Sequence, residues 1–133
     1  MATLKKELIL PCPATSFWNA ARDLGALHTR LVPGFVVATE LDAGGQSRNV
    51  TFANGMSAKE EILSCDDERR RLAWNAHGAH TTHYNAVLEV FEHPEGTRVV
   101  WTTDLLPHQM AGPISEMQDQ ALAAMKRTFT RST

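Results

Sequence analysis

The chain has 133 residues, 43% of them hydrophobic and 21% charged, and 13 basic against 15 acidic residues give a formal net charge of −2. This length predicts a single domain over residues 1–133, large enough to bury a core. The balanced charge predicts no nucleic-acid partner, and no apolar run has membrane-spanning length. The apolar run Leu8 to Pro11 is too short for a signal-peptide core, so a cytoplasmic location is expected.

The first part of the chain predicts one strand followed by two short helices. Alternating residues indicate a strand over Thr3–Leu10, which two prolines then end. A helical pattern begins at Ala14 and runs to Leu24, where a glycine breaks it. A second short helix is expected over Ala26–Leu31, ahead of a Pro-Gly pair.

Six strands separated by turn residues are expected next. The expected strands are Phe35–Leu41, Ser47–Ala53, Ser57–Cys65, Arg70–Ala76, Tyr84–Glu92 and Thr97–Leu106. The dipeptide Asn54-Gly55 favours a two-residue hairpin turn, which would pair Ala53 with Met56. In that register Arg48 lies directly opposite Glu61, on the same face of the sheet.

The last long segment, Pro113 to Phe129, predicts an amphipathic helix. At 100° per residue its apolar side chains fall on one side and its charged side chains on the other. The apolar side carries Ile114, Met117, Ala121, Leu122, Met125, Thr128 and Phe129, with Gln118 in its middle. Such a stripe has to be covered, and the strands before it can cover it only as a sheet that curls under its own twist. The predicted fold class is therefore α+β, with a seven-stranded curled antiparallel sheet around a long C-terminal helix.

Alternation along the strands predicts which side chains face the concave side of this sheet. The predicted set is Val50, Phe52, Glu61, Leu63, Cys65, Leu72, Trp74, Ala76, Tyr84, Ala86, Leu88, Val90, Val99 and Trp101. A register error of one residue would turn any strand's set to the other face.

The order of these segments resembles a known family. The runs that carry the likeness are PATSFWNAARDLGALHTRLVPGF, SRNVTFANGMSAKEEIL, DDERRRLAW, HYNAVLEVF and TRVVWTTDL, closed by the long helix. Together they look like the START-like superfamily (SRPBCC), which includes the birch-pollen allergen, plant hormone receptors and bacterial polyketide cyclase/dehydrase-like proteins. The chain looks most like the small bacterial cyclase-like members.

The resemblance implies a helix-grip fold with a cavity between sheet and last helix that takes a mostly apolar small molecule. It also implies that Arg48, Phe52, Glu61, Trp74 and Tyr84 face this cavity. Carriers, receptors and enzymes share the architecture, so the resemblance does not choose among them. Combined with the alternation pattern, it gives a candidate ligand-binding set. That set is Arg48, Phe52, Glu61, Leu63, Trp74, Tyr84, Leu88, Trp101, Met117, Gln118 and Met125.

Polar members of this set have two interpretations. Arg48 and Glu61 either anchor a carboxylate, carbonyl or hydroxyl of a ligand or form a structural ion pair. Gln118 and Tyr84 either face a wet cavity or bond each other and buried water. Glu61 and Tyr84 are also the candidate catalytic residues, although pairing with Arg48 would make Glu61 a poor base.

No metal or nucleotide cofactor is expected. His77, His80 and His83 invite a zinc interpretation, but in an extended chain 77 and 83 point opposite to 80, so ordinary loop histidines are favoured. Cys12 and Cys65 lack metal spacing and are expected to be reduced thiols.

Two functions follow from these features. The first is a carrier or sensor that binds a lipid-like, aromatic or polyketide-like molecule. The second is a cyclase- or dehydratase-like enzyme in which Glu61, Tyr84 or a histidine moves a proton. The expected partner is a small hydrophobic molecule. The sequence leaves open whether the protein forms a homodimer.

Overall fold

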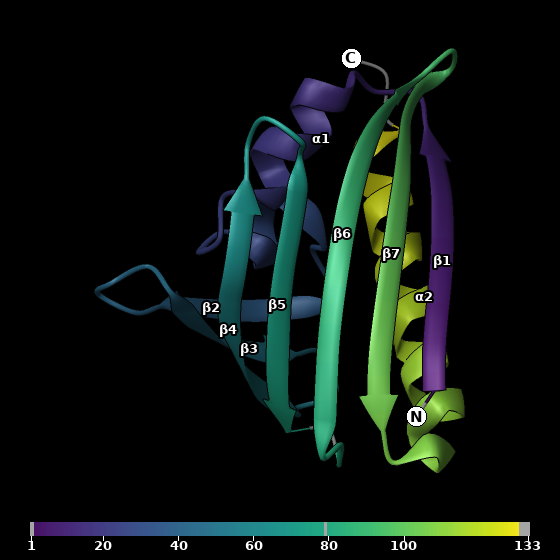
Figure 1. Cartoon of the computed structure of the whole chain (residues 1–133). Coiled ribbons are helices and arrows are strands. Elements are labelled where there is room, and N and C mark those ends of the chain that lie inside the picture. Colours follow the sequence, from purple (N-terminus) through teal and green to yellow (C-terminus); the bar gives the residue numbers. More distant parts are fainter. Residues whose placement is uncertain (1, 79, 131–133) are drawn as a thin grey trace.

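One antiparallel sheet and one long helix dominate the computed structural model, which describes residues 2–78 and 80–130 (Figure 1). The elements in chain order are β1 Ala2–Leu10, α1 Ala14–Ala21, the π-helical turn η1 Leu27–Leu31, β2 Val36–Leu41, β3 Ser47–Phe52, β4 Ser57–Asp66, β5 Arg71–Gly78, β6 His83–His93, β7 Gly96–Leu106, the 3-10 turn η2 His108–Met110, and α2 Ala111–Phe129. The seven strands have the order β1-β7-β6-β5-β4-β3-β2. The predicted α+β helix-grip fold is confirmed.

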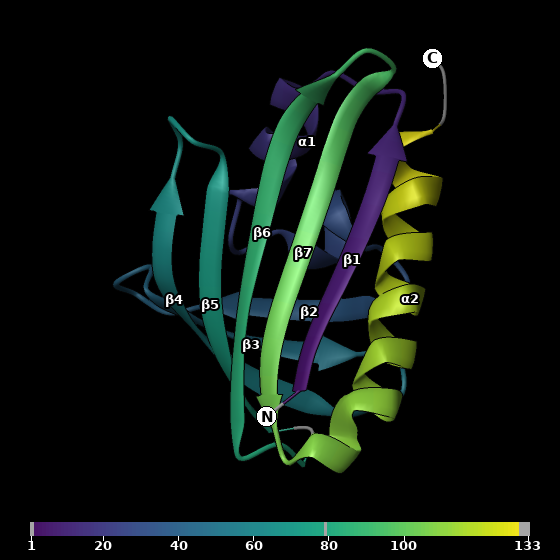
Figure 2. The same cartoon turned by 45° about the vertical axis from the view of Figure 1, so that its right-hand side comes forward.

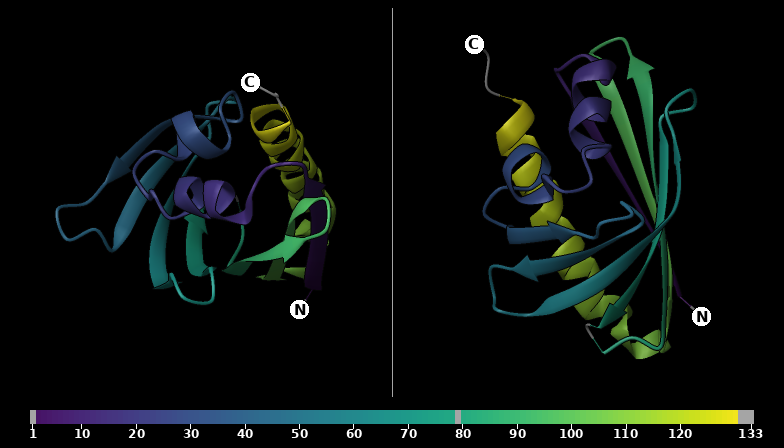
Figure 3. Two further views of the ribbon diagram at one scale, coloured as in Figure 1. Left: turned by 90° about the horizontal axis from the view of Figure 1, so that it is seen from above. Right: turned by 90° about the vertical axis from the view of Figure 1, so that its left-hand side faces the viewer.

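The sheet bends, so that β2 and β3 run out from it toward α2 (Figure 3). α2 begins two residues earlier than predicted and buries Ile114, Gln118, Ala121, Ala124 and Met125. Four of these residues belong to the stripe expected from helical spacing, and Ala124 adds to it, whereas Met117, Leu122, Thr128 and Phe129 are only partly buried. The helix therefore closes the concave side of the sheet.

α2 lies beside the edge strand β1 (Figure 2), and a polar contact joins the two elements. Alternation along β1 turns Lys6 toward the helix, where its Nζ donates to Ser115 Oγ at 2.7 Å and to Asp119 Oδ1 at 2.8 Å. The Lys6 side chain is 19% exposed, so its aliphatic part is covered while its ammonium group meets the helix.

The two short segments after β1 cover the end of the concave side. α1 ends at Ala21, earlier than the predicted Leu24, and packs Phe17 against Phe129 of α2 with ring centroids 4.9 Å apart. Trp18 Nε1 donates to Asp67 Oδ1 at 2.9 Å, which ties α1 to the turn between β4 and β5. The second predicted helix forms a single π-helical turn.

The β3–β4 connection differs from the prediction by one residue. The loop has three residues, 53–55, because Phe52 pairs with Met56: its N–H donates to Met56 O at 2.8 Å. Gly55 has φ +89°, a left-handed conformation that closes a three-residue hairpin loop.

This loop overturns the predicted pairing of Arg48 with Glu61, because Arg48 lies opposite Glu60. The one-residue slip turns Ala58 and Glu60 to the buried side of β4. A bulge between Ile62 and Ser64 follows. The predictions that Glu61 and Leu63 face the concave side are therefore wrong, and Leu63 is 53% exposed. Beyond the bulge Cys65 lies opposite Leu72, so it keeps the predicted face, although it is exposed.

Among the helices of residues 2–78 and 80–130, none combines the length and apolarity needed to cross a membrane.

Candidate functional site

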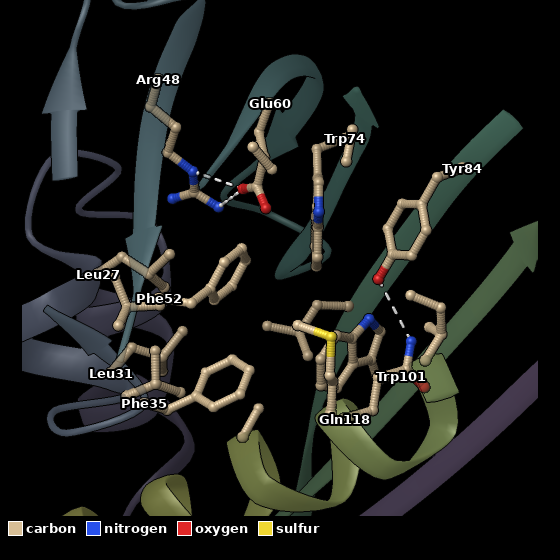
Figure 4. A pocket seen from close by; sticks show the side chains of 18 of the residues that line it. Leu27, Leu31, Phe35, Arg48, Phe52, Glu60, Trp74, Tyr84, Trp101 and Gln118 are labelled. Carbon is tan, nitrogen blue, oxygen red and sulfur yellow. Dashed lines mark hydrogen bonds and ion pairs between the residues drawn. The ribbon is translucent and has the colours of Figure 1, made fainter. Parts of the chain in front are cut away.

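A cavity of about 100 Å³ lies between the concave face of the sheet and α2. Figure 4 shows aromatic and aliphatic side chains on most of its walls and two polar groups at separate places. Its lining includes these members of the predicted set: Arg48, Phe52, Trp74, Tyr84, Leu88, Trp101, Met117, Gln118 and Met125. Glu61 and Leu63 do not line it.

The sequence did not reveal the wall formed by η1 and the start of β2. Leu27, Leu31, Val32, Phe35 and Val36 line the cavity from this side. The four-residue spacing of Leu27 and Leu31 predicts a buried helix face, but not which part of the fold it meets. A T-shaped contact joins Phe35 to Phe52 of β3, with ring centroids 5.4 Å apart. This contact extends the apolar wall from η1 onto the sheet.

Arg48 and Glu60 form a buried ion pair on the β3–β4 side of the cavity. The Arg48 Nε and Nη2 groups both contact Glu60 Oε1, at 2.9 and 2.8 Å, and Nη1 donates to Leu24 O at 3.1 Å. Arg48 is 3% exposed. Since the protein's own carboxylate and carbonyl occupy the guanidinium, Arg48 is not a free cation awaiting a ligand carboxylate.

The second oxygen of Glu60 is oriented differently. In Figure 4 it points away from Arg48 and toward the interior of the cavity. It has no hydrogen-bond partner within the described ranges 2–78 and 80–130. Glu60 therefore presents the cavity with a hydrogen-bond acceptor that sequence analysis assigned to Glu61.

Glu61 lies on the opposite, convex face. Its side chain is 51% exposed, and its Oε1 lies 2.9 Å from His77 Nε2. The predicted role of Glu61 inside the cavity is therefore wrong, and the reason is the three-residue loop before β4. Within the described ranges, no three His, Cys, Asp or Glu residues gather as metal ligands would.

A second polar group joins β6, β7 and α2. Gln118, which is 2% exposed, donates from Nε2 to Thr103 Oγ1 at 2.9 Å and to Tyr84 Oη at 3.3 Å. Burial raises the pKa of Tyr84 to about 12, and the charge of Glu60 acts in the same direction, whereas the Gln118 hydrogen bond acts against them. Tyr84 is therefore a neutral hydroxyl at physiological pH, able to donate a hydrogen bond but unsuited to act as a base.

The aromatic rings of Trp74 and Trp101 lie between the two polar groups, with centroids 6.3 Å apart (Figure 4). A cavity of this kind, enclosed by apolar walls with a few directed polar groups, is typical of small-molecule sites.

Comparison with known proteins agrees with this architecture. Residues 1–132 match the family described as polyketide cyclase / dehydrase and lipid transport. The chain belongs to this family. It is thereby an SRPBCC, or START-like, protein, as the resemblance in its sequence indicated. No curated protein sequence matches the chain.

Solved structures share the fold at low sequence identity. An uncharacterised protein from Bacillus thuringiensis is 17% identical, with a TM-score of 0.85 over 96% of this chain and 98% of that chain. Ginseng major latex-like protein 151 from Panax ginseng is 15% identical, with a TM-score of 0.77 over 98% of each chain. The protein Ara h 8.0201 is 14% identical, with a TM-score of 0.74 over 95% of each chain. At such identities the likeness concerns the fold alone.

The first testable prediction compares two neighbouring carboxylates. Glu60→Gln leaves the buried Arg48 charge without its counter-ion, and we expect it to lower the free energy of unfolding by about 3–5 kcal/mol. Glu61→Gln is the matched control on the exposed face, with an expected change within about 0.5 kcal/mol. Urea denaturation of both variants measures the difference. Equal losses, or a larger loss in Glu61→Gln, would contradict the β3–β4 register.

The second prediction concerns Tyr84, the one tyrosine of the chain. Because its pKa is raised from 10.0 to about 12 in the folded protein, tyrosinate absorbance should appear near pH 12 in the native state. In urea it should appear near pH 10. The free energy of unfolding then falls as the pH rises from 10 toward 12, since only the unfolded chain loses the proton in that range. Native titration near pH 10 would show that the hydroxyl is not buried.

Proposed function

We propose that this protein binds one small, mostly apolar molecule in the cavity between the sheet and α2. The observation that carries the proposal is the cavity itself, since its walls are aromatic and aliphatic and its polar groups are few. Membership in a family described by polyketide cyclase, dehydrase and lipid transport supports a hydrophobic molecule as the ligand.

The size of the cavity bears on the ligand. Ligand pockets commonly have volumes of about 300–1,000 Å³, so about 100 Å³ suits a single small ring. A larger lipid-like or polyketide-like molecule requires the lining to move. Met117 and Met125 on α2 are suited to such movement, because the unbranched methionine side chain adapts readily to different shapes.

Catalysis of a cyclase or dehydratase type is the second candidate function. The observation that favours it is the Glu60 oxygen that points into the cavity without a hydrogen-bond partner in the described ranges. A carboxylate beside a substrate held in a fixed shape can take part in proton transfer. In this candidate function the free oxygen of Glu60, rather than Glu61, accepts a hydrogen bond from the substrate, and Tyr84 serves as a donor.

The third prediction tests binding by filling the cavity. Ala121 lies at the middle of α2, lines the cavity and is 2% exposed. Ala121→Leu adds volume inside the cavity, so we expect the affinity for toluene, measured by titration calorimetry, to fall at least about tenfold. Ala123→Leu, on the exposed face of the same helix, should leave the affinity unchanged.

Circular dichroism establishes that both variants keep the fold before titration. Equal toluene affinity in Ala121→Leu and the wild type would contradict binding in this cavity. For the enzymatic alternative, mass spectrometry of an added poly-β-ketone should reveal loss of water. Such a product from the wild type, but not from Ala121→Leu, would establish catalysis in the cavity rather than binding alone.

A further inference from the structure

The geometry points to a subsite at the β7–α2 side of the cavity that binds a neutral hydroxyl group of the ligand. This inference rests on the proposed ligand-binding function and names the chemical class of the ligand. The subsite consists of Trp101, Gln118 and Tyr84, which all line the cavity.

Two buried atoms of this subsite lack partners. Trp101 Nε1 and Gln118 Oε1 have no hydrogen bond within residues 2–78 and 80–130. Trp101 is 8% exposed and Gln118 is 2% exposed. Buried polar atoms are nearly always paired, because an unpaired one loses the hydrogen bonds that water would supply. One unpaired donor and one unpaired acceptor in the lining of a single cavity indicate a missing partner that both accepts and donates.

The surrounding hydrogen bonds of the described residues do not satisfy these two atoms. The Gln118 amide nitrogen donates to Thr103 and Tyr84, which leaves its carbonyl oxygen unused. Tyr84 accepts from Gln118, so its own O–H remains able to donate, and its raised pKa keeps that proton in place. In Figure 4 the indole nitrogen of Trp101 lies on the side of its ring that faces Tyr84 and the Gln118 amide.

A hydroxyl group fits this arrangement better than a carbonyl or a carboxylate does. Its oxygen accepts hydrogen bonds from the Trp101 N–H and the Tyr84 O–H, and its proton is donated to the Gln118 oxygen. A ligand carbonyl would leave the Gln118 oxygen unpaired. A ligand carboxylate also lacks the proton, and Arg48, the one cationic residue among the described lining residues, is occupied by Glu60 and Leu24 O.

The walls favour a ring beneath that hydroxyl. The tilted Trp74–Trp101 pair and the edge-on Phe35–Phe52 pair line the same cavity. Aromatic side chains pack best against flat or ring-shaped apolar groups. A neutral phenol or ring alcohol therefore fits the whole site, because its ring packs against the aromatic walls and its hydroxyl group pairs with the subsite.

Titration calorimetry with three related probes tests the subsite. Toluene, para-cresol and para-toluate share one ring and one methyl group and differ in carrying no polar group, a hydroxyl or a carboxylate. We expect wild-type protein to bind para-cresol at least about tenfold more tightly than toluene, and para-toluate more weakly than either. Trp101→Phe removes the indole donor and keeps an aromatic ring, so it should reduce the preference for para-cresol over toluene to about twofold or less.

Gln118→Leu removes the acceptor, so it should also reduce the preference for para-cresol over toluene to about twofold or less. Gln120→Leu carries the same substitution on the exposed face of α2 and should keep the full preference. Two variants that act through different atoms protect the test against one of them failing to fold.

Each outcome bears on a different claim. Equal wild-type affinities for para-cresol and toluene would overturn the hydroxyl subsite and leave apolar ligand binding standing; an internal water would then satisfy the two atoms. Tightest binding of para-toluate would also overturn the subsite, in favour of an anion site. Failure of all three probes to bind would contradict the proposed function itself.

Discussion

The apolar stripe of α2 has to be buried, and the concave face of the sheet is the surface that buries it. The helix meets this requirement with Ile114, Ala121, Ala124 and Met125, which are small or flexible side chains apart from Ile114. Against the bent sheet, such a stripe leaves a cavity of about 100 Å³ unfilled. The cavity is therefore a consequence of how one helix covers a wide, curved sheet, and the groups that point into it determine what the protein can bind.

The two polar groups in the cavity have different physical characters. Arg48 and Glu60 satisfy most of each other's charge, so they add one free acceptor oxygen without adding a net charge to the cavity. Gln118, Tyr84 and Trp101 are uncharged, and they retain unused donors and an unused acceptor. A site of this composition favours a neutral ligand, because an ionised ligand would lose its hydration without gaining a counter-ion. Membership in the family defines the fold, whereas these side chains give the site its own chemistry.

Sequence patterns predicted most of the fold, because local periodicity determines it. Apolar side chains at helical spacing identified α2, and alternation identified the inward residues of β5, β6 and β7, such as Trp74, Leu88 and Trp101. The β4 prediction failed at a single loop, because Asn54-Gly55 fits both a two-residue turn and a three-residue loop with Gly55 in the left-handed conformation. That one-residue difference places Glu60, instead of the predicted Glu61, on the concave face of the sheet. The η1 wall and the unpaired atoms of Trp101 and Gln118 depend on contacts between distant segments, which no local pattern encodes.

The most direct test of the account is the position of a bound ligand. Methionine methyl groups labelled with carbon-13 report that position by nuclear Overhauser effects to added toluene. The account predicts cross-peaks from toluene to the methyl groups of Met117 and Met125, which line the cavity from α2. Met56 and Met110 lie outside the lining and should show none. Cross-peaks confined to Met56 or Met110 would place the ligand on the surface and contradict binding between the sheet and α2.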